Sequence, residues 1–128
     1  MDNPATLTTE PISRLTLALF AGASGDHNPI HVDLDFARAA GMDDVFAHGM
    51  LSMAYLGRML TDWMPPQALR EFSVRFTALT HVHDRLVCSG RIVERFERNE
   101  EQLARVELQA ASQEGEVRLT GEAVVVLL

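Results

Sequence analysis

The stretch that decides the fold is AHGMLSMAYLGRMLTDWMPP, residues 47–66. Its helical spacing lasts until Pro65 and Pro66, which cannot continue a helix, so we expect a helix over residues 47–64. Apolar side chains leave this helix little polar face, which is typical of a helix in the interior of a domain. They are Met50, Leu51, Met53, Ala54, Tyr55, Leu56, Met59, Leu60 and Trp63. We therefore predict a long helix buried at the centre of the molecule.

The chain after the prolines reads almost entirely as strand. Its pattern predicts four long strands, over residues 70–80, 85–98, 102–112 and 117–127. The pairs His83-Asp84, Asn99-Glu100 and Glu114-Gly115 are the expected turns between them. Consecutive strands with such short connections form an antiparallel sheet. One long helix against one antiparallel sheet is an α+β layer architecture, and a sheet wrapped around a central helix is the hot-dog fold.

The first half of the chain predicts shorter elements. Ser13 is a good N-cap for a helix that Gly25 ends, and a second short helix is expected over residues 33–40. Residues 7–12 are expected to add a short first strand. The 128 residues suffice for one core and not for two, so we expect a single domain over residues 1–128.

Charge and composition exclude several function classes. The net charge of -7 disfavours a nucleic-acid partner, and without any lysine the chain has neither a Schiff-base lysine nor a lysine-bearing phosphate loop. A single cysteine, Cys88, excludes an internal disulfide and a cysteine-cluster zinc site. The longest apolar run, residues 123–128, is far shorter than a bilayer span, and residues 1–5 lack the features of a signal peptide. We therefore expect a cytoplasmic protein with no membrane partner.

The loop FAGASGDHNPIH, residues 20–31, contains the strongest candidates for catalytic residues. It presents a carboxylate, Asp26, and an imidazole, His31, on a path that Pro29 stiffens. Such a pair can position and polarise one water molecule, which is general acid–base equipment near neutral pH. The same residues also fit a purely structural Asx turn followed by proline. His27 and His31 stand at metal-ligand spacing, but Pro29 prevents the helix that would place both on one face.

A second candidate feature is Gly49, at the start of the long helix. Its backbone N–H has no side chain in the way, and helix N-termini favour negative charge, so it can hold an oxygen that becomes anionic during a reaction. The alternative is that Gly49 is small only for close packing. We interpret Cys88, within an expected strand, as a packing residue and not as a nucleophile.

The two motifs together resemble the MaoC-like dehydratase family, which includes (R)-specific enoyl-CoA hydratases and dehydratases of 3-hydroxyacyl thioesters. The likeness rests on residues 20–31 and on AHGML, residues 47–51. RFTA, residues 75–78, and GEA, residues 121–123, extend it over about residues 14–128.

The resemblance implies a hot-dog fold and a reversible, cofactor-free hydration of trans-2-enoyl thioesters, carried by CoA or acyl carrier protein, to (R)-3-hydroxyacyl thioesters. Asp26 and His31 would hold the water and shuttle the proton, and the Gly49 amide would polarise the thioester carbonyl. The substrate would lie against Asn28, His48 and Met50. No metal is called for, and a homodimer is expected because a single hot-dog chain leaves strand edges open.

Two alternatives stay open at this point. A non-catalytic hot-dog subunit could bind acyl thioesters within a hetero-oligomer, although such a subunit needs no intact Asp26–His31 pair. A hot-dog thioesterase usually has a carboxylate on its central helix, where this chain has only Asp62, near the far end. For a CoA carrier, local arginines such as Arg70, Arg75 and Arg85 are candidates.

Overall fold

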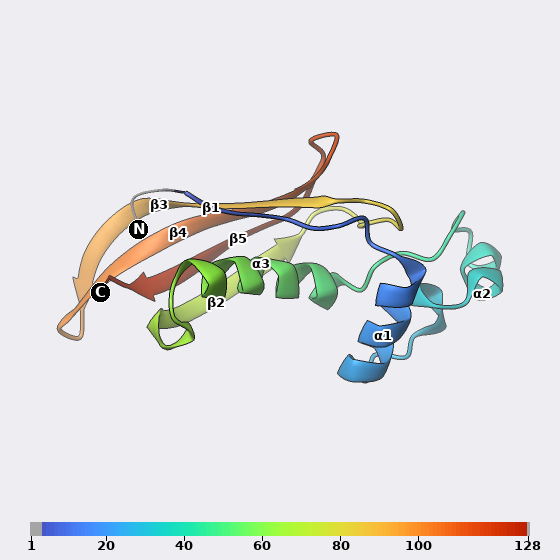
Figure 1. Cartoon of the computed structure of the whole chain (residues 1–128), viewed down its shortest axis with the longest axis horizontal. Helices are drawn as coiled ribbons and strands as arrows, with labels where there is room; N and C mark the ends of the chain where they lie inside the picture. The colour runs from blue at the N-terminus through green and yellow to red at the C-terminus, as the bar shows by residue number, and fades with distance from the viewer. Residues whose placement is uncertain (1–3, 128) are drawn as a thin grey trace.

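The computed structural model describes residues 4–127. An antiparallel five-stranded sheet is its main element, with the strand order β1-β3-β4-β5-β2. The strands are β1 (Ala5–Thr8), β2 (Leu69–Phe76), β3 (Leu86–Arg98), β4 (Glu101–Ser112) and β5 (Val117–Val126). The sheet curves over the long helix α3 (Gly49–Trp63), as Figure 1 shows. This is the α+β hot-dog architecture that the sequence predicts.

The remaining elements lie mainly at the end of the sheet where α3 begins. Helices α1 (Arg14–Ser24) and α2 (Leu34–Ala39) sit together there, joined by a loop and the 3-10 turn η1 (Pro29–His31) (Figure 1). A second 3-10 turn, η2 (Pro66–Ala68), follows α3 and leads into β2. Because α1 and α2 stand beyond the end of α3, they leave its side away from the sheet uncovered.

Helix α1 begins and ends as its sequence predicts. The Ser13 hydroxyl accepts a hydrogen bond from the Thr16 amide at 3.1 Å, which satisfies one of the free N–H groups of the first turn. At the other end Gly25 adopts a φ of 78°, and its amide donates to the carbonyl of Ala21. A left-handed residue closes a helix at little cost only where it lacks a Cβ. Gly25 thereby fixes where the next residue, Asp26, leaves the helix.

The core lies between α3 and the inner face of the sheet. Leu56, Met59 and Leu60 of α3 are almost completely buried, and so are Val106 and Leu108 of β4. At Gly90 of β3 a Cβ would come within 3.2 Å of both Met59 and Leu108, so the absence of a side chain there lets helix and sheet approach closely.

The expectation that α3 is buried all round is wrong for the single chain. Met50 is 58% exposed, and Ala54 and Arg58, one and two turns further along, are exposed as well. These positions share one face of the helix. The sheet covers only the opposite face, so an apolar sequence pattern here marks a surface that the single chain leaves open.

Two strand boundaries also differ from expectation. The strand expected over residues 70–80 ends at Phe76, because the amides of Thr77 and Ala78 both donate to the carbonyl of Arg118 and the regular ladder stops there. The strand expected over residues 7–12 is β1, which ends at Thr8; Pro11, downstream, has no N–H for a ladder. No helix among residues 4–127 is long and apolar enough to cross a membrane. Met1–Asn3, part of the signal-peptide argument, lie outside the described residues.

Candidate active site

The loop between α1 and η1 is fixed by hydrogen bonds to its own side chains. The Asp26 amide donates to the Ser24 hydroxyl at 3.1 Å, and the Asn28 amide donates to Asp26 Oδ1 at 3.3 Å. Asn28 Oδ1 in turn accepts from the Ile30 amide at 3.1 Å, just where Pro29 starts the 3-10 turn. Asn28 therefore shapes the loop, and the loop aims the Asp26 carboxylate at the start of α3.

His31 is buried, with 8% of its surface exposed, and its hydrogen-bond partner determines which tautomer the neutral ring adopts. Its Nδ1 lies 2.8 Å from the main-chain oxygen of Phe46. A carbonyl oxygen only accepts, so Nδ1 carries the proton of the neutral ring and Nε2 keeps a free lone pair. Because of the Phe46 carbonyl, Nε2 is the His31 nitrogen that can accept a proton.

His48 lies directly against His31. The two rings stack with their centroids 4.0 Å apart and their planes 27° from parallel. His48 Nε2 donates to the main-chain oxygen of Asp26 at 3.2 Å, and the Phe20 ring makes an edge-type contact with His48, with the ring centroids 4.9 Å apart. Its Nδ1 is buried and has no hydrogen-bond partner among residues 4–127. His48 therefore contacts both residues of the expected catalytic pair, one through its ring and the other through the backbone.

The surroundings keep His48 neutral. Burial lowers the pKa of His48 below its ordinary value of 6.5, and the neighbouring His31 lowers it further. The hydrogen bond to Asp26 and the charge of its carboxylate raise the pKa of His48, but these are the smaller effects. A neutral His48 places no positive charge next to His31.

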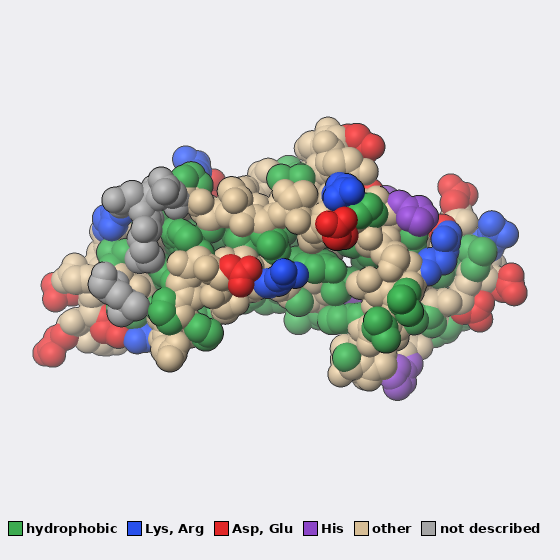
Figure 2. All heavy atoms as spheres, viewed as in Figure 1, with side chains coloured by type: hydrophobic (Ala, Val, Ile, Leu, Met, Phe, Trp, Pro, Cys, Tyr) green, Lys and Arg blue, Asp and Glu red, His purple; other side chains and the backbone are tan. Residues whose placement is uncertain are grey.

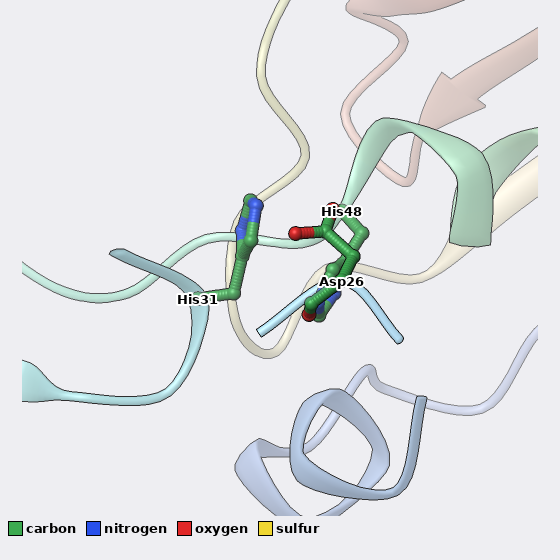
Figure 3. A group of neighbouring side chains, drawn as sticks. All are labelled: Asp26, His31 and His48. Atoms are coloured by element: carbon green, nitrogen blue, oxygen red, sulfur yellow. The ribbon is translucent and has the colours of Figure 1, made fainter. Parts of the chain in front are cut away.

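Asp26, His31 and His48 form one cluster at the beginning of α3 (Figure 3). A carboxylate oxygen and one ring nitrogen from each histidine all lie within 4.8 Å of one another. The loop and the start of α3 are separated by α2 in the sequence, and the fold brings them together in space. His27, by contrast, is exposed and is not a member of this cluster.

The cluster is better built for a water molecule than for a metal ion. A histidine binds a metal along the lone pair in its ring plane, at about 2.0–2.1 Å for zinc. The His31 and His48 rings are stacked, so the lone pairs in their planes do not converge on one point. A water molecule between the Asp26 carboxylate and His31 needs no such convergence, because it can donate to one group and to the other.

Gly49 is the first residue of α3, next to His48 in the chain. The first amides of a helix have no partner within the helix, so they are free to bind an oxygen. A Cβ on Gly49 would come within 3.1 Å of the Phe76 ring, so the glycine also allows that ring to lie close. Phe76 is 50% exposed and Met50 is 58% exposed, so an open apolar surface borders this amide.

Other candidate residues lie apart from the cluster. Cys88 is buried, and burial raises the pKa of its thiol to about 11, which fits a packing residue. A groove of about 800 Å³ lies on the sheet face away from α3. It is lined by polar and ion-paired side chains such as Arg91 and Glu107, and none of the three cluster residues borders it.

Phe46 is the residue that sequence reasoning missed. It acts through its main-chain carbonyl, so no pattern of side chains points to it. Its position opposite His31 appears only when the segment before α3 is placed in the fold.

Comparison with known proteins agrees with the fold and with the family resemblance of the sequence. A family model described as a MaoC like domain matches residues 2–114. An (R)-specific enoyl-CoA hydratase from Rhodospirillum rubrum is 37% identical over 75 residues, which are 57% of this chain and 52% of that protein. The chain therefore spans about half the length of this curated relative.

Solved structures match over nearly the whole chain. An unliganded R-hydratase from Pseudomonas aeruginosa has a TM-score of 0.85 and 29% identity, covering 98% of this chain and 79% of its own. An (R)-hydratase from A. caviae involved in PHA biosynthesis has a TM-score of 0.85 and 26% identity, covering 99% of this chain and 96% of its own. With its fold, its loop motif and the family model in agreement, this chain belongs to the MaoC-like domain family.

Proposed function

We propose that the protein catalyses the reversible hydration of trans-2-enoyl thioesters to (R)-3-hydroxyacyl thioesters. The observation that carries the proposal is the cluster of the Asp26 carboxylate and the His31 ring beside the first turn of α3. The hydratases that this chain resembles support the reaction class and the stereochemistry.

The reaction needs three groups, and the cluster together with the adjacent Gly49 amide offers a candidate for each. The oxygen of water bonds to the β-carbon of the enoyl group while its proton passes to a base. A proton is delivered to the α-carbon, and the electron pair of the double bond is held in between as an enolate on the thioester oxygen. Asp26 and His31 Nε2 orient the water and exchange its protons, and the Gly49 amide donates to the enolate oxygen. Dehydration runs through the same steps in reverse, so one site serves both directions.

We also propose a homodimer, with the site at its boundary. The sheet ends in β2, an eight-residue strand with one open edge, and free edges of this length are normally paired or covered. The exposed Phe76 and Met50 lie where β2 and α3 approach each other. A second copy that continues the sheet from β2 would cover this apolar surface and close the site.

The carrier of the acyl group is proposed as CoA or acyl carrier protein. Of the arginines considered for a CoA phosphate, Arg70 is held by both oxygens of Glu101, at 2.9 and 2.6 Å, and Arg85 faces Glu10. Arg75 is exposed on β2, near the proposed boundary, and is the best placed of the three. We place the protein in the cytosol, where a single buried thiol stays reduced.

Hydration of crotonyl-, octenoyl- and dodecenoyl-CoA tests the function. We expect the enoyl absorbance to fall without release of free CoA thiol, and chiral analysis to find the (R)-3-hydroxy product. Release of thiol with the enoyl group intact would instead establish a thioesterase. Folded protein that hydrates none of the three alone, but does so after mixing with a second hot-dog chain, would establish the accessory-subunit alternative.

A further inference from the structure

The orientation of His31 depends on a short segment that has no helix or ladder of its own. Phe46, whose carbonyl accepts from His31 Nδ1, lies between α2 and α3. This segment pairs with the chain that follows β2: Phe46 forms an isolated antiparallel bridge with His81, and the Ala47 amide donates to the Thr80 carbonyl at 2.9 Å. The position of the Phe46 carbonyl is therefore set by the position of residues 80–81.

Residues 80–81 are in turn held by a buried carboxylate. Asp84 is 8% exposed, and its Oδ2 accepts from the His81 amide at 2.8 Å. The same oxygen accepts from Arg118 Nη2 at 3.0 Å, in an ion pair whose arginine is 6% exposed. One carboxylate oxygen thus joins the backbone of His81 to a side chain at the beginning of β5.

Arg118 fixes both ends of the connection between β2 and β3, residues 77–85. Its main-chain oxygen accepts from the Thr77 and Ala78 amides, where β2 ends, and its guanidinium binds Asp84, just before β3. Hydrogen bonds between Asp84 and Ile12, and between His83 and Ile12, hold the same turn from the other side. The turn is thereby attached firmly to the sheet.

The ion pair is poorly explained as a source of stability alone. Burying two charges removes both from water, and the attraction between them offsets the lost hydration only with excellent geometry and full hydrogen bonding. Within the described part of the chain, Arg118 Nε is buried and has no partner. The pair fixes the position of the His81 amide, and His81 forms the backbone bridge with Phe46.

We propose that Asp84 and Arg118 are positioning residues for His31, acting through His81 and the Phe46 carbonyl. The proposal rests on the proposed function, since it assigns to this pair the task of keeping His31 Nε2 ready to accept a proton from water. Neither residue contacts the cluster, so the effect is on the orientation and tautomer of His31.

Asp84→Ala and Asp84→Asn test the proposal, with Glu116→Gln as the control. Glu116 is the exposed partner of the same arginine, so its replacement removes an ion pair without touching Asp84. We expect Asp84→Ala to lower kcat, since misplacement of a catalytic group by about 1 Å costs on the order of 10²-fold, while KM changes little. Asp84→Asn retains an oxygen for the His81 amide, so its loss should be smaller. Glu116→Gln should keep the wild-type kcat.

The tautomer of His31, read from its ¹⁵N resonances in the resting protein, is the second measurement. Wild type and Glu116→Gln should show Nδ1–H, and Asp84→Ala should show a mixture of both tautomers. If Asp84→Ala does not fold, Asp84→Asn decides, with the same shift in smaller degree. A folded Asp84 variant with the wild-type kcat and tautomer, or wild-type protein with the proton on Nε2, overturns the proposal. Failure of the proposed function would show separately, as wild-type protein that hydrates no enoyl-CoA.

Discussion

At the scale of single residues, the site consists of one carboxylate and two imidazoles with different tasks. The Phe46 carbonyl accepts from His31 Nδ1 and leaves the free lone pair on Nε2, whereas His48 donates through Nε2–H to the backbone of Asp26. The two rings stack, so a charge on one is unfavourable for the other. His48 is therefore better interpreted as a support for the pair than as a third proton-transfer group.

Replacement of either member of the pair should slow turnover strongly. We expect Asp26→Asn and His31→Ala each to lower kcat by about 10²- to 10⁴-fold, the usual contribution of a positioned acid or base. The assay is enoyl-CoA hydration, with circular dichroism to verify the fold. His27→Gln is the matched control, because His27 is an exposed histidine of the same loop outside the cluster. An Asp26→Asn protein with the wild-type rate would rule out the water-orienting role.

The neutral state of His48 makes stability depend on pH. Because the pKa of His48 is lowered in the folded chain, the unfolded chain binds a proton at a pH where the folded chain does not. The free energy of unfolding should therefore fall as the pH drops below about 6.5, from its full value at higher pH.

Urea unfolding at about pH 7.5 and 5.5 measures this loss in wild type and in His48→Gln. The glutamine cannot titrate and retains an N–H for the Asp26 carbonyl, so the variant should lose less stability on acidification. His27→Gln, which changes an exposed histidine, should lose as much as wild type. Equal losses in His48→Gln and wild type would show that His48 is not the group that titrates.

At the scale of elements, the end of α1 determines where the loop that carries Asp26 starts. Gly25 has a φ of 78°, and an L residue in that conformation costs roughly 1–2 kcal/mol. Gly22, in the same helix, has nothing within 4 Å of its Cβ position, and glycine within a helix is destabilising by roughly 0.5–1 kcal/mol relative to alanine.

The two glycines therefore predict opposite effects of the same substitution. Gly25→Ala should lower the free energy of unfolding by about 1 kcal/mol and Gly22→Ala should raise it by a similar amount, as measured by urea denaturation. Gly25→Ala should also reduce kcat, because residue 25 sets the direction of the chain into Asp26, and Gly22→Ala should not. A Gly25→Ala protein as stable as wild type would show that the left-handed cap is not required.

At the scale of the whole molecule, residues 4–127 leave one face of α3 and the β2 edge of the sheet uncovered. Figure 2 shows hydrophobic side chains along this side of the molecule. Large hydrophobic side chains that are exposed in the described chain include Leu15 and Leu19 of α1, one turn apart, and Met50 at the start of α3. Open apolar surface next to a free strand edge is typical of an interface between copies.

A dimer joined through β2 is therefore expected in solution. Light scattering should give twice the mass of the chain, and hydrogen exchange should show β2 amides protected at concentrations at which the dimer forms. The turn at Glu114–Gly115, which is exposed, should exchange equally fast at every concentration. A fully active monomer would contradict the proposal, and a dimer with unprotected β2 would place the interface elsewhere.

The sequence by itself determined the fold, and it was enough to propose Asp26 and His31 as the catalytic pair. Both depend on local signals: Ser13 and Gly25 bound α1, paired prolines end α3, and Asp26 and His31 share one short loop whose bends come from Asn28 and Pro29. Signals of this kind act within a few residues, so they can be read without knowing the rest of the chain.

The tertiary structure alone decided how these residues work together. The sequence predicts His48 beside a substrate, but only the fold stacks it on His31 and joins it to Asp26. The sequence does not reveal the role of the Phe46 carbonyl, because every residue type has the same backbone oxygen. It does not reveal the buried Asp84–Arg118 pair either, because two residues so far apart in the chain form no recognisable motif. The sequence also could not predict the open face of α3. Apolar side chains indicate that a helix face is covered by something, but only the arrangement of the elements shows whether the same chain covers it.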